Sequence, residues 1–195
     1  ILVAGCSHTF GVGLDDSQTW VQQFKDIIPK KVVIKNGIKT QRTFKIINIS
    51  ISGASNDYIA RALLQCTDII KPNCIIACYT YDARREAILL PHNGQVLQMT
   101  ATVPDTLPGD DEIIDEYKGW FMTMHDESNH YNWDKKREIV KLLCRANNID
   151  LIETHVGAMK RIQRSLYKEL GFVDLARDAE HFGPHTHKTV SYTHL

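Results

Sequence analysis

Short apolar runs alternate with helix-like segments along most of this chain. Each run is four to six residues long and ends in small or polar residues, as buried strands do; the runs lie at 1–4, 46–51, 74–78 and 149–152. Apolar positions with the spacing of one helix face predict helices at 17–28, 58–66, 135–146, 158–170 and from 185 onward. Strands and helices in alternation predict a three-layer α/β/α fold around a mainly parallel sheet with right-handed crossovers.

Two segments depart from this alternation. Residues 30–45 carry six lysines and arginines around Asn36-Gly37, which predicts a hairpin or a surface excursion with a solvated basic face. Residues 91–133 hold three prolines, an acidic stretch and five aromatic residues without clean periodicity. We interpret 91–133 as a cap or insertion within one domain that spans 1–195. A solvated acidic excursion whose aromatic residues only attach it to the core is an equal alternative.

Composition and charge fit one ordinary globular domain. The 195 residues are 43% hydrophobic and 24% charged, with 23 basic and 23 acidic side chains. This balance disfavours a nucleic-acid partner, and no apolar run approaches the roughly 20 residues of a membrane span. Five cysteines without a C-x-x-C pair predict buried free thiols in a reducing compartment. We therefore expect a cytoplasmic or virion-associated protein. Because Ile1 already lies in an apolar run, we also expect that a segment precedes it, so secretion stays open.

Candidate chemistry lies where the first strand ends and near the end of the chain. Ser7 follows the first strand directly, between small residues, where a tight turn can expose a serine near a helix. A serine nucleophile needs a general base, and that base needs an orienting carboxylate. Asp178 and His181 supply both in a D-x-x-H spacing that lets the carboxylate fold back onto the ring. We therefore predict Ser7 as nucleophile, His181 as base and Asp178 as its orienting group.

These motifs, in this order, resemble those of the SGNH hydrolases, the superfamily that includes the GDSL esterases and lipases. The segment 5–9, Gly-Cys-Ser-His-Thr, resembles the first block, Gly-Asp-Ser-x-Thr/Ser, with Cys6 where aspartate is usual. The segment 48–53 resembles the second block, and the resemblance assigns the Gly53 N–H to the oxyanion hole. Asp178 and His181 resemble the last block. The resemblance implies a flavodoxin-like parallel sheet and makes Ser7 both nucleophile and oxyanion donor.

The third block departs from the family pattern. Where the family has Gly-x-Asn-Asp and the asparagine donates to the oxyanion, this chain reads Tyr-Thr-Tyr-Asp over 79–82. Thr80 or Tyr81 takes the position depending on register, and Asn56 is a third candidate from the neighbouring loop. Losing one oxyanion donor costs on the order of 10²–10³ in turnover, so an active variant, a slow enzyme and a binding relic all fit. Arg84-Arg85-Glu86 after this strand resembles a subset of phage and bacterial SGNH-like proteins, which favours a variant.

The resemblance implies a serine hydrolase of a small-molecule or glycan ester, with O-acetylated carbohydrate among the candidates and no metal or organic cofactor. The alternative is a carbohydrate-binding or virion structural module of the same fold that has lost turnover. The missing asparagine and the aromatic residues of 91–133 motivate this alternative. A nucleotide-binding protein is disfavoured because Gly11-Val12-Gly13 lacks the further glycine and the lysine of phosphate loops.

Three other groups of residues have competing interpretations. His181, His185 and His187 would hold zinc only if all three lay on one side, and no acidic or cysteine ligand completes the set. Cys6 could be a thiol nucleophile, but at the turn after the strand its side chain is expected to point into the core, away from that of Ser7. Arg84 and Arg85 are interpreted first as a solvated or ion-paired face, and second as groups that hold a substrate carboxylate or phosphate.

Overall fold

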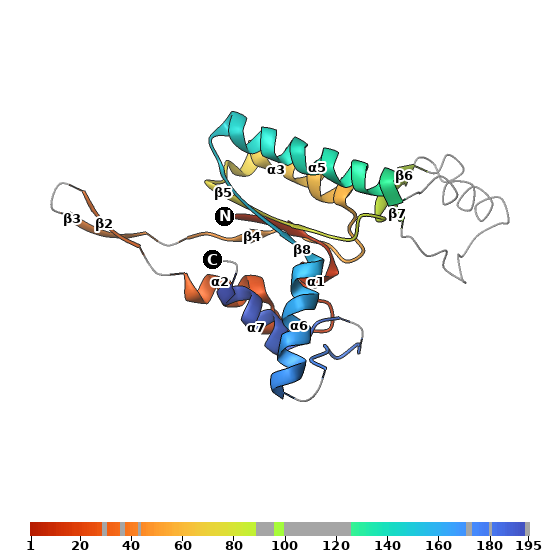
Figure 1. The fold of residues 1–195 in the computed structure, drawn as a ribbon. Helices are drawn as coiled ribbons and strands as arrows, with labels where there is room; N and C mark the ends of the chain where they lie inside the picture. Colours follow the sequence, from red (N-terminus) through yellow and green to blue (C-terminus); the bar gives the residue numbers. More distant parts are fainter. Residues whose placement is uncertain are drawn as a thin grey trace.

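A four-stranded parallel sheet forms the centre of the molecule, with helices on both faces (Figure 1). The structure, a computed structural model, describes residues 1–28, 31–35, 38–42, 44–88, 96–99, 126–170, 173–179 and 181–193. The spatial order of the strands is β4 (Ile47–Asn48), β1 (Leu2–Gly5), β5 (Cys74–Tyr79) and β8 (Asp150–His155). All three pairings are parallel, and the first strand lies second in the sheet, as in flavodoxin-like folds. The predicted three-layer α/β/α fold is confirmed.

Successive residues of the central strands face opposite sides of the sheet and form two separate cores. On one face, Leu2, Ala4 and Ile75 pack with residues of α3 (Asn56–Ile70) and α5 (Asp126–Asn147). On the other face, Val3 and Ile76 pack with residues of α2 (Trp20–Ile27), α6 (Val156–Leu170) and α7 (Pro184–Thr193). Strands that are buried on both faces read as continuous apolar runs, which is why the sequence reveals them.

Local capping explains where two helices begin. The helix expected from Ser17 begins at Trp20, because the Thr19 hydroxyl accepts a hydrogen bond from the Gln22 N–H at 3.3 Å. Ser17 itself lies in a short 3-10 turn, Asp16–Gln18. Ser55 caps α3 in the same way as Thr19, by accepting a hydrogen bond from Tyr58 N.

Three other elements differ from the prediction. The helix expected at 135–146 already begins at Asp126. The strand expected at 46–51 is only Ile47–Asn48, although backbone bonds from Ile49 N to Val3 O and from Ile51 N to Gly5 O continue its contact with β1. An antiparallel pair of strands, β6 (Arg85–Ile88) and β7 (Val96–Met99), was not expected.

The two segments that break the strand–helix alternation are described in part. The predicted hairpin is confirmed by the antiparallel pairing of β2 (Lys31–Lys35) and β3 (Ile38–Arg42), which project away from the sheet (Figure 1). Most of 91–133, the predicted cap, lies outside the described residues. Its described parts belong to β7 and to the first turns of α5. There Trp133 packs edge-on against Tyr79, with ring centroids 6.5 Å apart, so this aromatic residue joins the core.

A histidine joins the helices of the lower layer in Figure 1. His187 of α7 is buried, and its Nδ1 accepts a hydrogen bond from the backbone N–H of Trp20 at 3.0 Å, at the first residue of α2. Burial lowers the pKa of His187 to about 4 from its ordinary 6.5, against a weaker opposing effect of Asp174. The imidazole is therefore neutral in the folded protein at neutral pH, which the hydrogen bond to its Nδ1 requires.

We predict that this histidine makes the fold sensitive to acid. Its folded pKa lies below its unfolded pKa, so its contribution to stability is complete above about pH 6.5 and is lost as the pH falls toward 4. Urea unfolding at pH 7 and pH 4.5 should show that His187→Gln loses less stability than the wild type, by on the order of 2 kcal/mol. His185→Gln, on the exposed side of the same helix, should behave like the wild type. If the free energy of unfolding changes equally between pH 7 and pH 4.5 for His187→Gln and the wild type, the prediction is wrong.

The junction between β1 and α1 (Ser7–Phe10) gives a second prediction, about packing. A methyl group at Gly5 would run into the Cβ and Oγ1 atoms of Thr9, which folds back over the strand end. Gly5→Ala should therefore lower the free energy of unfolding by about 1–3 kcal/mol, the usual cost of overpacking. Thr9→Gly returns the space, so the double variant should be less destabilised than the two single effects added together. If the two substitutions have additive effects on the free energy of unfolding in denaturant titrations, the contact with Thr9 is not the cause of the destabilisation by Gly5→Ala.

Candidate active site

The candidate residues gather because the register of the sheet aligns the carboxyl ends of its strands. Gly5 is paired with Cys78, and Tyr79 with His155, so β1, β5 and β8 end at one edge. The loops that begin at Cys6, Ser50 and Thr80 leave from this edge. In open parallel sheets this is the edge where ligands bind.

Ser7 is the first residue of α1 and follows the buried strand β1 directly. Cys6 takes the N-cap position with extended backbone, and the Ser7 carbonyl accepts hydrogen bonds from Gly11 N and Val12 N. The side chain of Cys6 is fully buried in the core, as predicted. Ser7 is only 2% exposed, and its N–H lies in the first helical turn, where the helix offers no carbonyl partner.

Asp178 and His181 form the pair that their spacing predicts. Asp178 Oδ2 lies 2.6 Å from Nδ1 of His181, and Asp178 Oδ1 accepts a hydrogen bond from the backbone N–H of His181 at 3.1 Å. The carboxylate thus fixes both the backbone and the ring of the same residue. Nδ1 is directed at the carboxylate, which leaves Nε2 as the ring nitrogen that is available for a substrate or a nucleophile.

The loop that carries this pair is docked onto the loop after α1. Ala176 N donates to the carbonyl of His181 at 2.9 Å, and Arg177 N donates to the carbonyl of Gly13 at 3.2 Å. Gly13 has φ +77°, and a Cβ there would lie 2.9 Å from Ala176 Cβ and 3.1 Å from Asp178 Cγ. Only glycine therefore allows the two loops to approach so closely.

His8 is the contact between the Ser7 loop and His181. The His8 and His181 rings tilt against each other with centroids 4.9 Å apart, and His8 stacks on Phe182 at 4.4 Å. Burial, followed by the nearby basic groups His181, Arg84, His187 and Lys160, lowers the pKa of His8 to about 3. Ser7 Oγ forms no hydrogen bond with His181 in the described part of the chain. The segment of Ser7 contacts His181 through the ring of the next residue, His8. Catalytic hydrogen bonds are often loose in unliganded sites.

The three predicted oxyanion donors occupy different environments. Ser7 offers its N–H at the start of α1, and Gly53 lies in a turn with φ +75°, where a Cβ would meet open space. Thr80 is fully buried, and its hydroxyl has no hydrogen-bond partner among the described residues. Tyr81, the alternative to Thr80, turns its ring toward Arg84 and Lys160.

Asn56, the third candidate donor, is committed to the backbone of the loop after β5. Its Oδ1 accepts a hydrogen bond from Thr80 N at 2.9 Å, and its Nδ2 donates to the carbonyls of Thr80 at 3.4 Å and Tyr81 at 3.3 Å. This asparagine is buried at the start of α3. It fixes the shape of the loop that carries Thr80, and its amide is not free to donate elsewhere without breaking these bonds.

The three histidines considered for zinc have separate partners. His181 is bound to Asp178, His187 accepts from Trp20, and His185 is exposed on α7. Within the part of the chain that the structure describes, no group of three His, Cys, Asp or Glu side chains is arranged to hold a metal ion. None of the described helices is long and apolar enough to cross a membrane.

Sequence reasoning missed several residues that shape this site. Asp174 is buried and accepts a hydrogen bond from Thr186 N at 2.5 Å, which ties the start of α7 to the loop of His181. His8 and Gly13 lie within motifs after the first strand, but the sequence assigned neither of them a role in the site. The sequence offered two signals. Asp174 lies between apolar residues just before the D-x-x-H segment, and Gly13 is a second glycine after the turn at Ser7. Neither signal indicates which distant residue Asp174 or Gly13 contacts.

Comparison with known proteins supports the fold. Neither a protein-family model nor a curated protein matches the sequence. The crystal structure of TesA is similar over 97% of this chain and 92% of TesA, with a TM-score of 0.51 and 13% identity. A G-D-S-L family protein from Desulfitobacterium hafniense DCB-2 (97% of this chain, 94% of that one) has a TM-score of 0.43 and 12% identity. The psychrotrophic esterase EstA from Pseudoalteromonas sp. (99% of this chain, 92% of that one) also has a TM-score of 0.43 and 12% identity.

The last two scores are too low to carry a conclusion, and at these identities the similarity to TesA concerns the fold and not the activity. Together with the parallel sheet and its strand order, it is sufficient to assign the architecture. The chain has a three-layer α/β/α fold that is similar to that of TesA.

Proposed function

We propose that this protein is a serine hydrolase that cleaves an ester or acyl bond with Ser7, His181 and Asp178. The observation that carries the proposal is the Asp178–His181 pair, joined at 2.6 Å and held against the helix that begins at Ser7. A carboxylate on Nδ1 of a histidine beside a serine at a strand end is the arrangement that activates a serine hydroxyl. The SGNH fold agrees with this chemistry.

The reaction proceeds in two halves. Ser7 Oγ attacks the carbonyl carbon while Nε2 of His181 takes the hydroxyl proton, and Asp178 stabilises the imidazolium that forms. The tetrahedral intermediate then breaks its bond to the leaving alcohol, whose oxygen receives the proton from His181. Water attacks the acyl-enzyme with His181 again as base, and the acid and free Ser7 are released. The first step requires Ser7 Oγ and Nε2 of His181 to come within hydrogen-bond distance, so a local rearrangement of the site precedes it.

The negative charge on the intermediate is stabilised by the N–H groups of Ser7 and Gly53 and by the hydroxyl of Thr80. A buried hydroxyl without a partner is costly in a resting protein, and an oxyanion would supply the missing acceptor. Neutral His8 beside the base adds no competing charge. The substrate class that follows is a small-molecule or glycan ester, including O-acetyl groups on carbohydrate.

The proposal predicts covalent labelling of one serine. A fluorophosphonate probe should label the intact protein at Ser7, because the probe phosphorylates a serine only when its base is in place. Ser7→Ala should abolish labelling, and His181→Gln and Asp178→Asn should slow it by about 10²-fold or more. Ser17→Ala, at an exposed serine on the next turn of the chain, is the matched control and should label like the wild type. A folded wild-type protein that stays unlabelled beside a reactive esterase would contradict the mechanism and leave the binding module as the better hypothesis.

The oxyanion assignment of Thr80 can be tested separately. Thr80→Val keeps the shape of the side chain and removes only the hydroxyl. Since that hydroxyl has no hydrogen-bond partner among the described residues, the free energy of unfolding should stay the same or rise slightly. The kcat for an activated ester should fall by about 10²-fold with KM little changed. If kcat does not change in the stably folded variant, the oxyanion is held by backbone N–H groups alone.

A further inference from the structure

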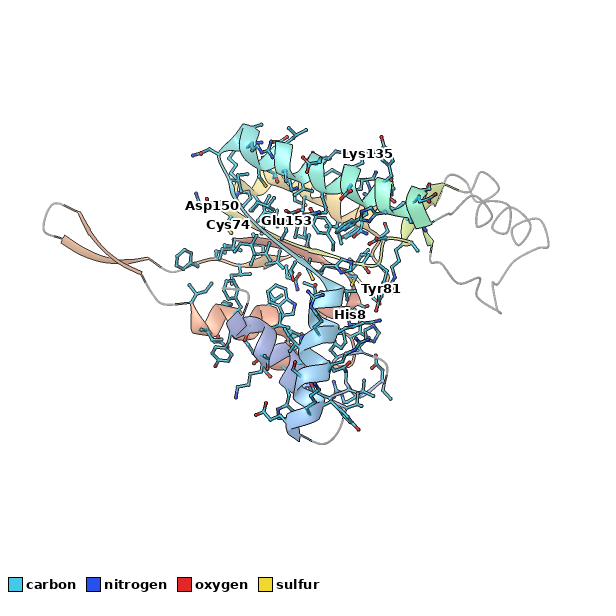
Figure 2. The ribbon with its side chains drawn as sticks, viewed as in Figure 1. His8, Cys74, Tyr81, Lys135, Asp150 and Glu153 are labelled. Atoms are coloured by element: carbon cyan, nitrogen blue, oxygen red, sulfur yellow. The ribbon has the colours of Figure 1, made fainter. Side chains whose placement is uncertain are left out.

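Two cations lie on one aromatic ring at the edge of the candidate active site. The Arg84 guanidinium carbon is 5.4 Å from the centre of the Tyr81 ring, and Lys160 Nζ is 4.7 Å from it. They come from different elements, since Arg84 follows β5 and Lys160 lies in the first turns of α6. Figure 2 places Tyr81 and His8 at the same edge of the sheet, beside the start of α6.

Neither cation has a carboxylate partner among the described residues. Two acidic residues, Asp82 and Glu86, lie two positions from Arg84 in the sequence. Asp82 faces two histidines, His130 at 3.5 Å and His155 at 3.7 Å. Glu86 forms a two-pronged ion pair with Arg61. Arg85, the neighbour of Arg84, donates to the Ser128 hydroxyl at 3.1 Å.

Arg84 keeps one guanidinium nitrogen, Nη1, buried and without a hydrogen-bond partner among the described residues, as does Nε of Arg85. Two like charges brought to one ring repel each other, and a buried unpaired N–H is costly. Contacts of the cations with the Tyr81 ring offset part of this cost. A negatively charged ligand would remove the rest of it.

The two cations lie close to the candidate catalytic loops, because the Tyr81 ring that they contact follows Thr80 directly. Both Arg84 and Lys160 act on the charge state of His8, whose ring touches that of His181. Tyr81, which holds them, directly follows Thr80 of the proposed oxyanion hole. A group held by these cations would therefore belong to a molecule whose ester carbonyl lies near Ser7.

We propose that Arg84 and Lys160, arranged on Tyr81, form a subsite for a carboxylate or phosphate group carried by the ester substrate. The planar guanidinium offers two parallel N–H donors to such an oxyanion, and the lysine adds a mobile charge on its other side. This inference rests on the proposed hydrolase function and adds to it that the substrate is an anionic ester.

Matched substrates test the subsite through kcat/KM. One pair puts the charge on the alcohol, 4-carboxyphenyl acetate against its methyl ester, and the other on the acyl chain, 4-nitrophenyl hemiadipate against its methyl ester. The wild type should prefer the anionic member of at least one pair, and added salt should weaken that preference. Arg84→Gln and Lys160→Gln should each reduce the preference about 5- to 10-fold, whereas Arg84→Lys should keep part of it.

Arg164→Gln is the control for the charge of α6. It removes an exposed arginine one turn beyond Lys160 and should leave the preference unchanged. Equal kcat/KM for charged and neutral esters in the wild type, or a preference that survives in both Arg84→Gln and Lys160→Gln, overturns the subsite.

A binding measurement separates failure of the subsite from failure of the hydrolase proposal. Calorimetric titration of Ser7→Ala with adipate and, separately, with inorganic phosphate needs no turnover and distinguishes the two anions. Binding of either anion that Arg84→Gln abolishes supports the subsite even if no ester is cleaved and no probe labels Ser7. If neither anion binds, the subsite is wrong, whatever the outcome of the labelling experiment.

Discussion

The parallel pairing of β1 with β5 is the constraint on which the rest of the site depends. Its register sets Gly5 beside Cys78, so the chain leaves the sheet at Cys6 and at Thr80 on the same edge. Both strands are buried on both faces and cannot slip by one residue without moving their apolar side chains into the wrong layer. The start of α1 and the loop of Thr80 are therefore fixed relative to each other by the core itself.

The second half of the site is held by different means. Residues 174–179, 181 and 182 are mostly irregular, and hydrogen bonds and close packing against the loop after α1 fix their position. Asp178 binds both the ring and the backbone of His181, Asp174 binds the start of α7, and Gly13 lets the loops approach. This part has less buried apolar surface than the sheet. Local opening of this loop should therefore cost less free energy than global unfolding.

The departure from the family's third block has a structural counterpart. The asparagine usual in that block donates to the oxyanion, whereas the asparagine nearby in this chain, Asn56, binds the backbone of the loop with both its donor and its acceptor. The hydroxyl of Thr80 has no hydrogen-bond partner among the described residues. Arg84 and Lys160 on the ring of the next residue, Tyr81, give the same loop a positive charge. The loop after β5 thus lacks the asparagine of the third SGNH block and carries other polar groups in its place.

The sequence by itself determined the fold class and the pairing of Asp178 with His181. Apolar runs and helix periodicity depend on burial of nearby residues, and the Asp178–His181 pair lies within three positions, so short-range geometry suffices for both. The start of α5 was missed although Asn129, Trp133, Val140 and Cys144 share one buried or half-buried helix face. Only the tertiary structure decided the partners of Asn56, the docking of Gly13 against Asp178, and the meeting of Arg84 with Lys160. Each of these contacts joins residues far apart in the chain, and strand register and loop packing, which no local pattern encodes, bring them together.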